Sequence, residues 1–228
     1  EMKYGVVFAG DSEVAPFLER VKIVRRSEKA MLTFYEGSYA GAEFVTLYTG
    51  VGKANAAVAA QVLIDHFGAE RVINGGTCGG IREGVEVFDS IVAESCFYHD
   101  MEESILTEFH PWLEEPRFLG DSTMLKAARQ LRPQTPLHFG FLATGDRFLE
   151  NQKQREGVLR RFPGALGADM ESAAFAHVCH VNGIPFLSIR TVTDNGKQSG
   201  EAAFEENVEK ASAISAGLCL ELIARLQE

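Results

Sequence analysis

The sequence has no long hydrophobic run and no excess of basic residues. None of its apolar stretches reaches the 18 residues or so of a transmembrane helix, and the amino end lacks the charged-then-apolar layout of a signal peptide. Its formal net charge is −10, from 22 Lys and Arg against 32 Asp and Glu. An acidic chain without a basic cluster suits neither nucleic acid nor an anionic membrane surface. We therefore expect a cytoplasmic protein that binds neither.

Cysteines are also few. The four of them are scattered and form no C-x-x-C pair, so the sequence predicts free thiols in a reducing compartment and no disulfide framework. His177, Cys179 and His180 are close in sequence but fall on a predicted helix, where residues two apart do not face each other. We expect no metal site there.

No linker, charge run or repeat divides the chain, so we expect a single domain over residues 1–228. Apolar or alternating runs predict strands at residues 3–9, 31–38, 43–49, 71–74, 90–93, 138–143 and 185–192. Three/four spacing predicts helices at residues 11–21, 52–67, 122–131, 151–162, 170–182 and 204–222. Strands that alternate with helices predict an α/β fold, a three-layer sandwich around a central mixed β-sheet.

Polar and acidic residues follow several of the predicted strands. Glu13 comes after the first strand, Glu171 opens a helix after another, and Asp194 ends the run at residues 185–192. In open α/β sheets, ligands bind outside the carboxyl ends of the strands, so we expect these residues to converge on one rim. The glycine-rich stretch at residues 75–80 allows close backbone approach to a ligand. It matches neither a Walker loop nor a G-x-G-x-x-G dinucleotide motif, and a tight turn is an equal interpretation.

Several short motifs together carry a family resemblance. They are ADMESAA at residues 168–174, IRTVTD at 189–194, GVGK at 50–53, YHD at 98–100, TGDRF at 144–148, and the glycine-rich stretch. In this order, over nearly the whole chain, they resemble the purine nucleoside phosphorylase/hydrolase superfamily. Within it, the sequence looks like the methylthioadenosine/S-adenosylhomocysteine nucleosidase branch. The resemblance implies a nucleoside phosphorylase-like fold and hydrolysis of the N-glycosidic bond of a 5′-modified adenine nucleoside in methionine salvage. It also implies a homodimer, with no cofactor and no metal.

The resemblance assigns roles to nine residues. Asp194 matches the acid that protonates N7 of the leaving purine, and its apolar strand favours the raised pKa which that role needs. Glu13 matches the carboxylate that activates water, helped by Arg190 and Thr77. Glu171 matches the residue that hydrogen-bonds the ribose 2′- and 3′-hydroxyls, and Met170 the residue that packs on the ribose face. Phe148 matches the aromatic residue that stacks on the purine, and the Leu149 backbone faces the edge of the base. Val51 matches a residue of the substrate pocket.

The main alternative is a phosphorylase, which uses phosphate in place of water. Phosphate needs cations, preferably arginines. Phosphorylases of similar sequence carry a Gly-Asp-Pro-x-Arg segment after the first strand and an arginine just before the glycine-rich stretch. This chain has GDSEV at residues 10–14, where Glu13 would repel phosphate and suits the activation of water, and it has Asn74 at the second position. Hydrolysis is therefore favoured.

The segment at residues 105–112, ILTEFHPW, departs from the family pattern that lines the 5′ pocket. The 5′ group, including that of a futalosine-type nucleoside, and the choice between adenine and hypoxanthine stay open. Phe109 and Trp112 are candidates for a lid or for loop packing.

Overall fold

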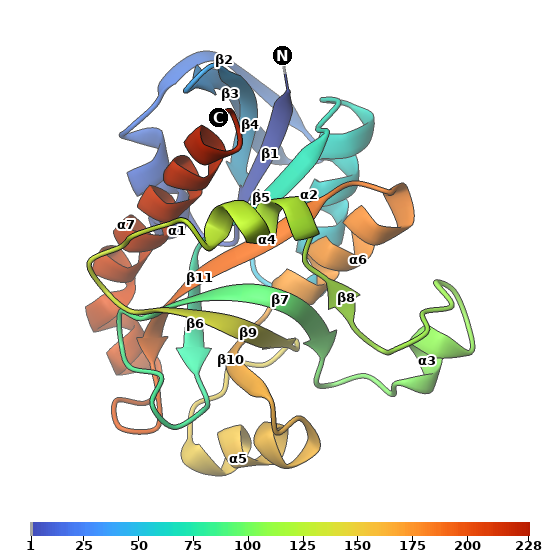
Figure 1. Cartoon of the computed structure of the whole chain (residues 1–228), viewed down its shortest axis with the longest axis vertical. Coiled ribbons are helices and arrows are strands. Elements are labelled where there is room, and N and C mark those ends of the chain that lie inside the picture. Colours follow the sequence, from blue (N-terminus) through green and yellow to red (C-terminus); the bar gives the residue numbers. More distant parts are fainter. Residues whose placement is uncertain (1) are drawn as a thin grey trace.

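The computed structural model describes residues 2–228, which form one mixed sheet covered by helices on both faces (Figure 1). The strands are β1 (Lys3–Phe8), β2 (Lys22–Lys29), β3 (Leu32–Tyr39), β4 (Ala42–Tyr48), β5 (Arg71–Asn74), β6 (Thr77–Gly80), β7 (Ser90–Tyr98), β8 (Phe118–Leu119), β9 (Leu137–Thr144), β10 (Ala165–Asp169) and β11 (Phe186–Asp194). The helices are α1 (Asp11–Leu18), α2 (Lys53–Asp65), α3 (Ser104–Thr107), α4 (Ser122–Ala128), α5 (Gln152–Arg161), α6 (Ser172–Asn182) and α7 (Glu201–Arg225).

The two faces of the sheet are filled by alternate residues of the same strands. On β1, Tyr4, Val6 and Phe8 pack on one side with α1, α4 and α7, while Val7 packs on the other side with α2 and α6. Successive side chains of a strand point to opposite faces, so a strand buried on both faces is apolar throughout. This arrangement confirms the predicted three-layer sandwich.

The strand order is β2-β3-β4-β1-β5-β11-β6-β10-β9-β7-β8, and β11 also pairs with β7. The first residues of β11 pair in parallel with β5, its middle with β7, and its last residues with β6. Strands β11, β6, β10, β9 and β7 thus form a closed circuit of pairings. β11 is buried along its whole length, and its last residue, Asp194, lies at the carboxyl end.

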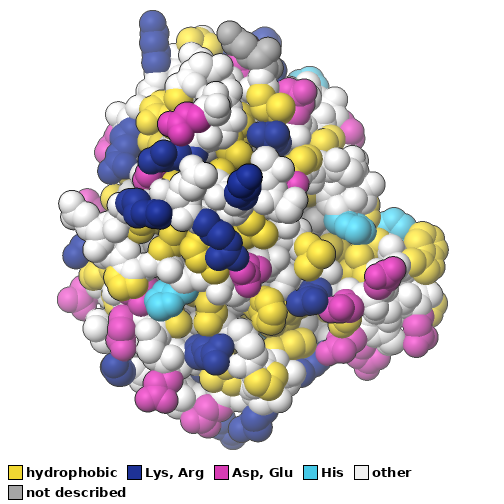
Figure 2. Space-filling model, in the orientation of Figure 1, with side chains coloured by type: hydrophobic (Ala, Val, Ile, Leu, Met, Phe, Trp, Pro, Cys, Tyr) yellow, Lys and Arg dark blue, Asp and Glu magenta, His cyan; other side chains and the backbone are white. Residues whose placement is uncertain are grey.

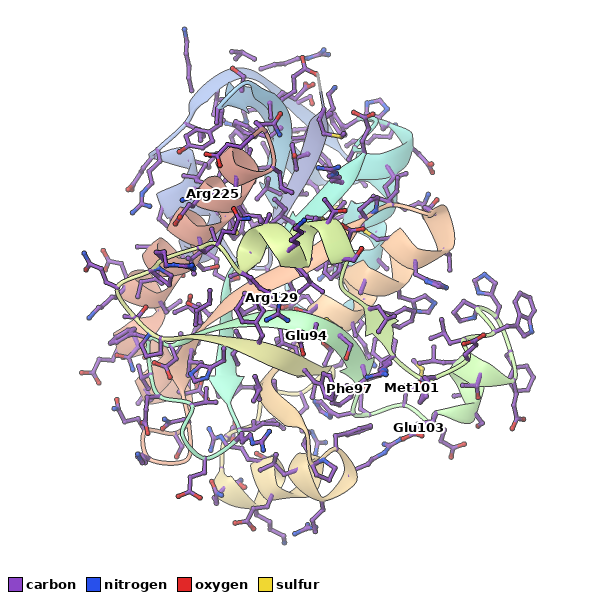
Figure 3. The ribbon with its side chains drawn as sticks, in the orientation of Figure 1. Glu94, Phe97, Met101, Glu103, Arg129 and Arg225 are labelled. Carbon is purple, nitrogen blue, oxygen red and sulfur yellow. The ribbon has the colours of Figure 1, made fainter. Side chains whose placement is uncertain are left out.

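Helix α4 is tied to the sheet by an ion pair at its end. Arg129 donates to Glu94 of β7 at 2.6 Å, and Figure 3 shows the two side chains turned toward each other. Both side chains are well exposed to solvent, so the pair contributes little to stability. The burial of the α4 residues Met124 and Ala128 holds this helix in place instead.

Several elements differ from the sequence expectations. Residues 77–80 were expected as part of a loop or tight turn, yet they form β6, paired with β10 and β11. Helix α1 ends at Leu18, short of the expected residue 21, and the chain turns directly into β2, which the sequence pattern did not indicate.

Candidate functional site

A cavity of about 510 Å³ opens at the carboxyl ends of the strands. Its walls come from the turn after β1, from β6, from the start of α6, from the end of β11 and from α7. Eight of the nine predicted site residues line it: Glu13, Val51, Thr77, Phe148, Met170, Glu171, Arg190 and Asp194. The ninth, Leu149, lines an adjoining cavity of about 30 Å³ that shares Phe148, Met170 and Asp194 with the larger one. The sequence motifs, far apart in the chain, therefore converge at one place.

Glu13 is buried, and its carboxylate is fixed by four donors. One oxygen accepts from the backbone N–H groups of Ala9 and Gly10 at 3.1 and 2.8 Å, which closes the first turn of α1. The other accepts from the backbone N–H and the hydroxyl of Thr77, at 2.5 and 2.9 Å. One carboxylate oxygen of Glu13 is thus bound at the start of α1, and the other is bound to Thr77 of β6, in the lining of the cavity. Gly76 makes this approach possible, because a Cβ at that residue would collide with the Glu13 carboxylate.

Arg190 is a fully buried anchor that organises the middle of the cavity. Its Nε donates to Asn74 at 3.0 Å, its Nη1 to the carbonyl of Thr77 at 2.8 Å, and its Nη2 to Glu171 at 3.2 Å. Asp169 lies 3.3 Å from its Nε. These contacts commit every nitrogen of the guanidinium to the protein. The amide oxygen of Asn74 accepts from Arg190 and helps to orient it.

Glu171 lies at the N-terminus of α6 but does not cap it. One carboxylate oxygen meets Arg190, and the other accepts from the backbone N–H of Gly52 at 2.9 Å. Burial raises the pKa of Glu171, although the positive charge of Arg190 opposes that shift. A costly buried carboxylate facing a cavity is typical of a binding site. Met170, beside it, lines both cavities.

Asp194 ends β11 inside the cavity and is 1% exposed. Burial raises its pKa above the ordinary value, although hydrogen bonds from Thr193 and Arg155 favour the ionised form. The Thr193 hydroxyl lies 2.8 Å from Oδ1, and the guanidinium of Arg155 lies 3.0 Å from Oδ2. Asp194 is thus buried with a raised pKa, as the apolar residues of its strand predicted. Arg155 was not among the predicted residues.

Phe148 and Leu149 form the wall next to Asp194. Phe148 is half-buried and meets Phe204 of α7 edge-on, with ring centroids 6.1 Å apart. Leu149 is buried, and its carbonyl accepts from Arg155 at 3.1 Å. An aromatic face and a backbone edge beside a buried acid suit a flat heterocycle with nitrogen acceptors.

Comparison with known proteins agrees with this geometry. The family model described as the phosphorylase superfamily matches residues 3–224. The chain belongs to this superfamily. It is 32% identical to the 5′-methylthioadenosine/S-adenosylhomocysteine nucleosidase of Geobacillus kaustophilus, over 100% of this chain and 99% of the relative. The nucleosidase of the same name from Neisseria meningitidis, solved with methylthio-immucillin-A, superposes with a TM-score of 0.90 at 30% identity, covering 98% of this chain and 99% of that one.

A third relative shares the fold alone. A futalosine hydrolase mutant of Helicobacter pylori superposes with a TM-score of 0.90 at 23% identity, over 98% of this chain and 99% of that one. The comparisons confirm three predictions: the nucleosidase-like membership, the nucleoside phosphorylase-like fold, and the class of N-glycosidic hydrolase. Within residues 2–228, no helix is long and apolar enough to cross a membrane.

Proposed function

We propose that this superfamily member hydrolyses the N-glycosidic bond of a 5′-modified adenine nucleoside and releases adenine and the free sugar. Methylthioadenosine, S-adenosylhomocysteine and 5′-deoxyadenosine are the candidate substrates. The observation that carries the proposal is a pair of buried carboxyl groups on one cavity. Asp194 sits in an environment that raises its pKa, and Glu13 is held as an acceptor by backbone and Thr77 donors. Two carboxyl groups in contrasting environments suit one acid and one base.

In the proposed first step, the carboxylic acid of Asp194 gives its proton to N7 of the purine. The C1′–N9 bond breaks, its electron pair moves into the purine, and the base leaves as a neutral molecule. Asp194 is left as a carboxylate and the sugar as an oxocarbenium-like cation. Burial raises the pKa of Asp194 and so favours the protonated acid before this step, and such proton transfer contributes about 10²- to 10⁴-fold in rate.

Glu13 completes the reaction in the second step. A water molecule attacks C1′, and one of its protons goes to the Glu13 carboxylate, so that the product is the free sugar. The donors from Thr77 and the turn after β1 hold this carboxylate in a fixed orientation. Glu171, held by Arg190 and Gly52, accepts hydrogen bonds from the ribose 2′- and 3′-hydroxyls.

Four wall residues position the rest of the substrate in this proposal. Met170 packs on the ribose face and Val51 on the sugar side of the cavity, while Phe148 stacks on the base. The backbone of Leu149 faces the edge of the purine. No step requires a metal ion or a cofactor.

The lining charges support water over phosphate as the nucleophile. Among the described residues, Arg190 is the only Lys or Arg that lines the cavity, and all its nitrogens already have protein partners. Seven Asp and Glu residues share that lining. A phosphate dianion would meet Glu13 without a free arginine to bind it.

A substrate panel tests the proposal. The purified protein is mixed with methylthioadenosine, S-adenosylhomocysteine, 5′-deoxyadenosine, adenosine, inosine and futalosine, with and without phosphate, and the products are separated by chromatography. We expect adenine and free sugar without phosphate. A sugar 1-phosphate formed only with phosphate would identify a phosphorylase instead, and preferential release of hypoxanthine from futalosine would identify a futalosine-type nucleosidase.

We further propose that the chain works as one domain in a cytoplasmic homodimer of methionine salvage. Exposed apolar side chains lie on α2, on α6 and around α3, which Figure 1 places on one side of the molecule: Val51, Val58, Ile105, Phe109, Trp112 and Val181. Figure 2 shows hydrophobic side chains and histidines together where the α3 segment lies. Phe109 and Trp112 do not line their own chain's cavity, whereas the exposed Val51 does. An apolar face that includes the cavity rim suits a self-association surface.

Replacing Trp112, which is 67% exposed, tests the dimer. We expect Trp112→Glu to shift the protein to a monomer in sedimentation velocity and to raise KM about tenfold, because a buried aromatic anchor dominates an interface. Leu119→Glu, equally exposed on β8, is the matched control. A wild-type monomer, or an unchanged dimer in the Trp112 variant, contradicts the proposed interface.

A further inference from the structure

Arg155 is a buried arginine on α5 that contacts two groups at the base end of the cavity. It is 1% exposed, although most of α5 is polar and exposed. Its Nη2 lies 3.0 Å from Oδ2 of Asp194 and donates to the carbonyl of Leu149 at 3.1 Å. One nitrogen therefore bridges the proposed acid and the proposed base-recognition edge.

The other contacts of Arg155 speak against a purely structural role. Among residues 2–228, its Nε and Nη1 have no hydrogen-bond partner, although both atoms are buried. Leaving buried donors of a charged group unpaired is costly, so a fold that needed only packing here would be better served by an apolar side chain. Both hydrogen bonds that the Arg155 side chain makes go to Asp194 and Leu149. The side chain also borders the small cavity that joins the larger one.

We propose that Arg155 is a positioning residue for proton transfer to the leaving base. It fixes the orientation of Asp194 and of the Leu149 carbonyl, and it stabilises the negative charge that Asp194 acquires when its proton moves to N7. The proton passes from the carboxyl oxygen to N7, the electron pair of the C1′–N9 bond passes into the purine, and Arg155 itself stays protonated throughout. This inference rests on the proposed hydrolytic function.

The interaction is stronger in the transition state than in the ground state. Before transfer, the charged guanidinium donates to an uncharged carboxyl group. After transfer, the same contact joins two opposite charges in a buried site, so it gains a Coulombic attraction that water does not screen. Arg155 should therefore act on kcat more than on KM.

Two substrates with different leaving groups test this role. Methylthioadenosine needs protonation at N7 before adenine can leave. In its counterpart with 4-nitrophenol in place of adenine, the leaving group is 4-nitrophenolate, a stable anion that needs no acid. We expect Arg155→Met to lower kcat on methylthioadenosine about 10- to 100-fold, with KM changed less than threefold. On the nitrophenyl compound, the same variant should stay within about threefold of the wild type. Arg160→Met, an exposed arginine of the same helix, should leave both rates unchanged.

Companion variants separate this inference from the proposed function. Asp194→Asn should show the same selective loss, larger in size, and Glu13→Gln should lose activity on both substrates. If Arg155→Met loses both activities equally, or keeps its purine activity, the positioning role is wrong. If Asp194→Asn spares the purine substrate, or the wild type cleaves neither compound, the proposed function fails instead.

A conservative variant covers the case in which Arg155→Met does not fold. Arg155→Lys keeps the positive charge but places it on a single nitrogen at the end of a flexible stem, which cannot reproduce the fixed geometry of the guanidinium. A selective loss on methylthioadenosine in Arg155→Lys, with a melting temperature near that of the wild type, supports the inference. Equal losses on both substrates overturn it.

Discussion

Asp194 shows how a single side chain is prepared for one protonation state. Burial favours the neutral acid, while hydrogen bonds from Thr193 and Arg155 favour the carboxylate. The effect of burial is the larger one, so the pKa of Asp194 is raised. We expect Asp194→Asn to lower kcat about 10²- to 10⁴-fold, because the amide cannot supply the proton to N7. Adenine release measures the effect, and the melting temperature should change little because Asn has nearly the same shape. A rate near that of the wild type would refute the acid role.

Glu171 adds a prediction about stability and pH. Its folded-state pKa is raised by burial, so above the ordinary value of 4.5 the folded protein holds a proton that the unfolded chain has released. Stability is then lost as pH rises from 4.5 toward the raised pKa. Glu171→Gln removes this dependence on pH. We therefore expect the free energy of unfolding of the variant, relative to that of the wild type, to rise by about 1–3 kcal/mol from pH 5 to pH 8. Urea unfolding at both pH values measures the gain.

A matched control separates this effect from a general change of charge. Glu205→Gln alters an exposed residue of α7, and its stability relative to the wild type should be the same at pH 5 and pH 8. If the two variants respond to pH alike, then the burial of Glu171 is not the cause.

The sequence indicates some site residues and hides others for physical reasons. Glu13 comes soon after the first strand, and Asp194 ends β11 within the motif at residues 189–194, so their meeting at one rim could be predicted. Arg155 lies 39 residues before Asp194, in a helix whose composition is polar, and no local pattern marks it as buried. Only the folded structure, in which the Arg155 side chain reaches Asp194 at the end of β11, reveals this contact.

At the scale of elements, burial decides which strands can be predicted. β1 and the first part of β11 are rich in apolar residues and are covered, so these hydrophobic runs predict both strands. β2, with the sequence KIVRRSEK, is largely exposed at the edge of the sheet and carries no such signal. β6, with the sequence TCGG, has low β-propensity and exists because β10 and β11 pair with it. Tertiary context overrides local preference in both cases.

The turn between β5 and β6 gives an element-scale prediction. Gly76 has φ +116°, and a Cβ there would collide with the Glu13 carboxylate that β6 holds. We expect Gly76→Ala to lower kcat at least tenfold and to destabilise the fold by about 1–3 kcal/mol, because both the backbone and Glu13 must shift. Activity and urea unfolding measure the two effects.

Gly84 provides the comparison. Its φ is +88°, but a Cβ there would meet open space. Gly84→Ala should therefore show the conformational cost of about 1 kcal/mol while keeping full activity. Equal activity losses in the two alanine variants would contradict the link between Gly76 and Glu13.

At the scale of the whole molecule, negative charge surrounds the candidate site. The chain carries a net charge of −10, and the segment at residues 102–115, which contains α3, has five Glu and no Lys or Arg. Asp11, Glu150 and Glu201 are exposed and line the cavity. A dimer partner that contributed the α3 segment would add further negative charge. The field at this rim should therefore repel anionic substrates.

Two 5′-thioadenosines of equal tail length, one ending in an amine and the other in a carboxylate, test this field. We expect kcat/KM to favour the amine about tenfold at low ionic strength, and the gap to close near 0.5 M salt because the Debye length falls below about 5 Å. Methylthioadenosine, which is uncharged, should respond little to salt. Glu201→Gln should narrow the gap, whereas Glu205→Gln, on the same helix but away from the cavity, should not. If the nucleoside with the carboxylate tail has the same kcat/KM as the one with the amine tail, then a cation outside the described lining offsets the negative charge of the rim.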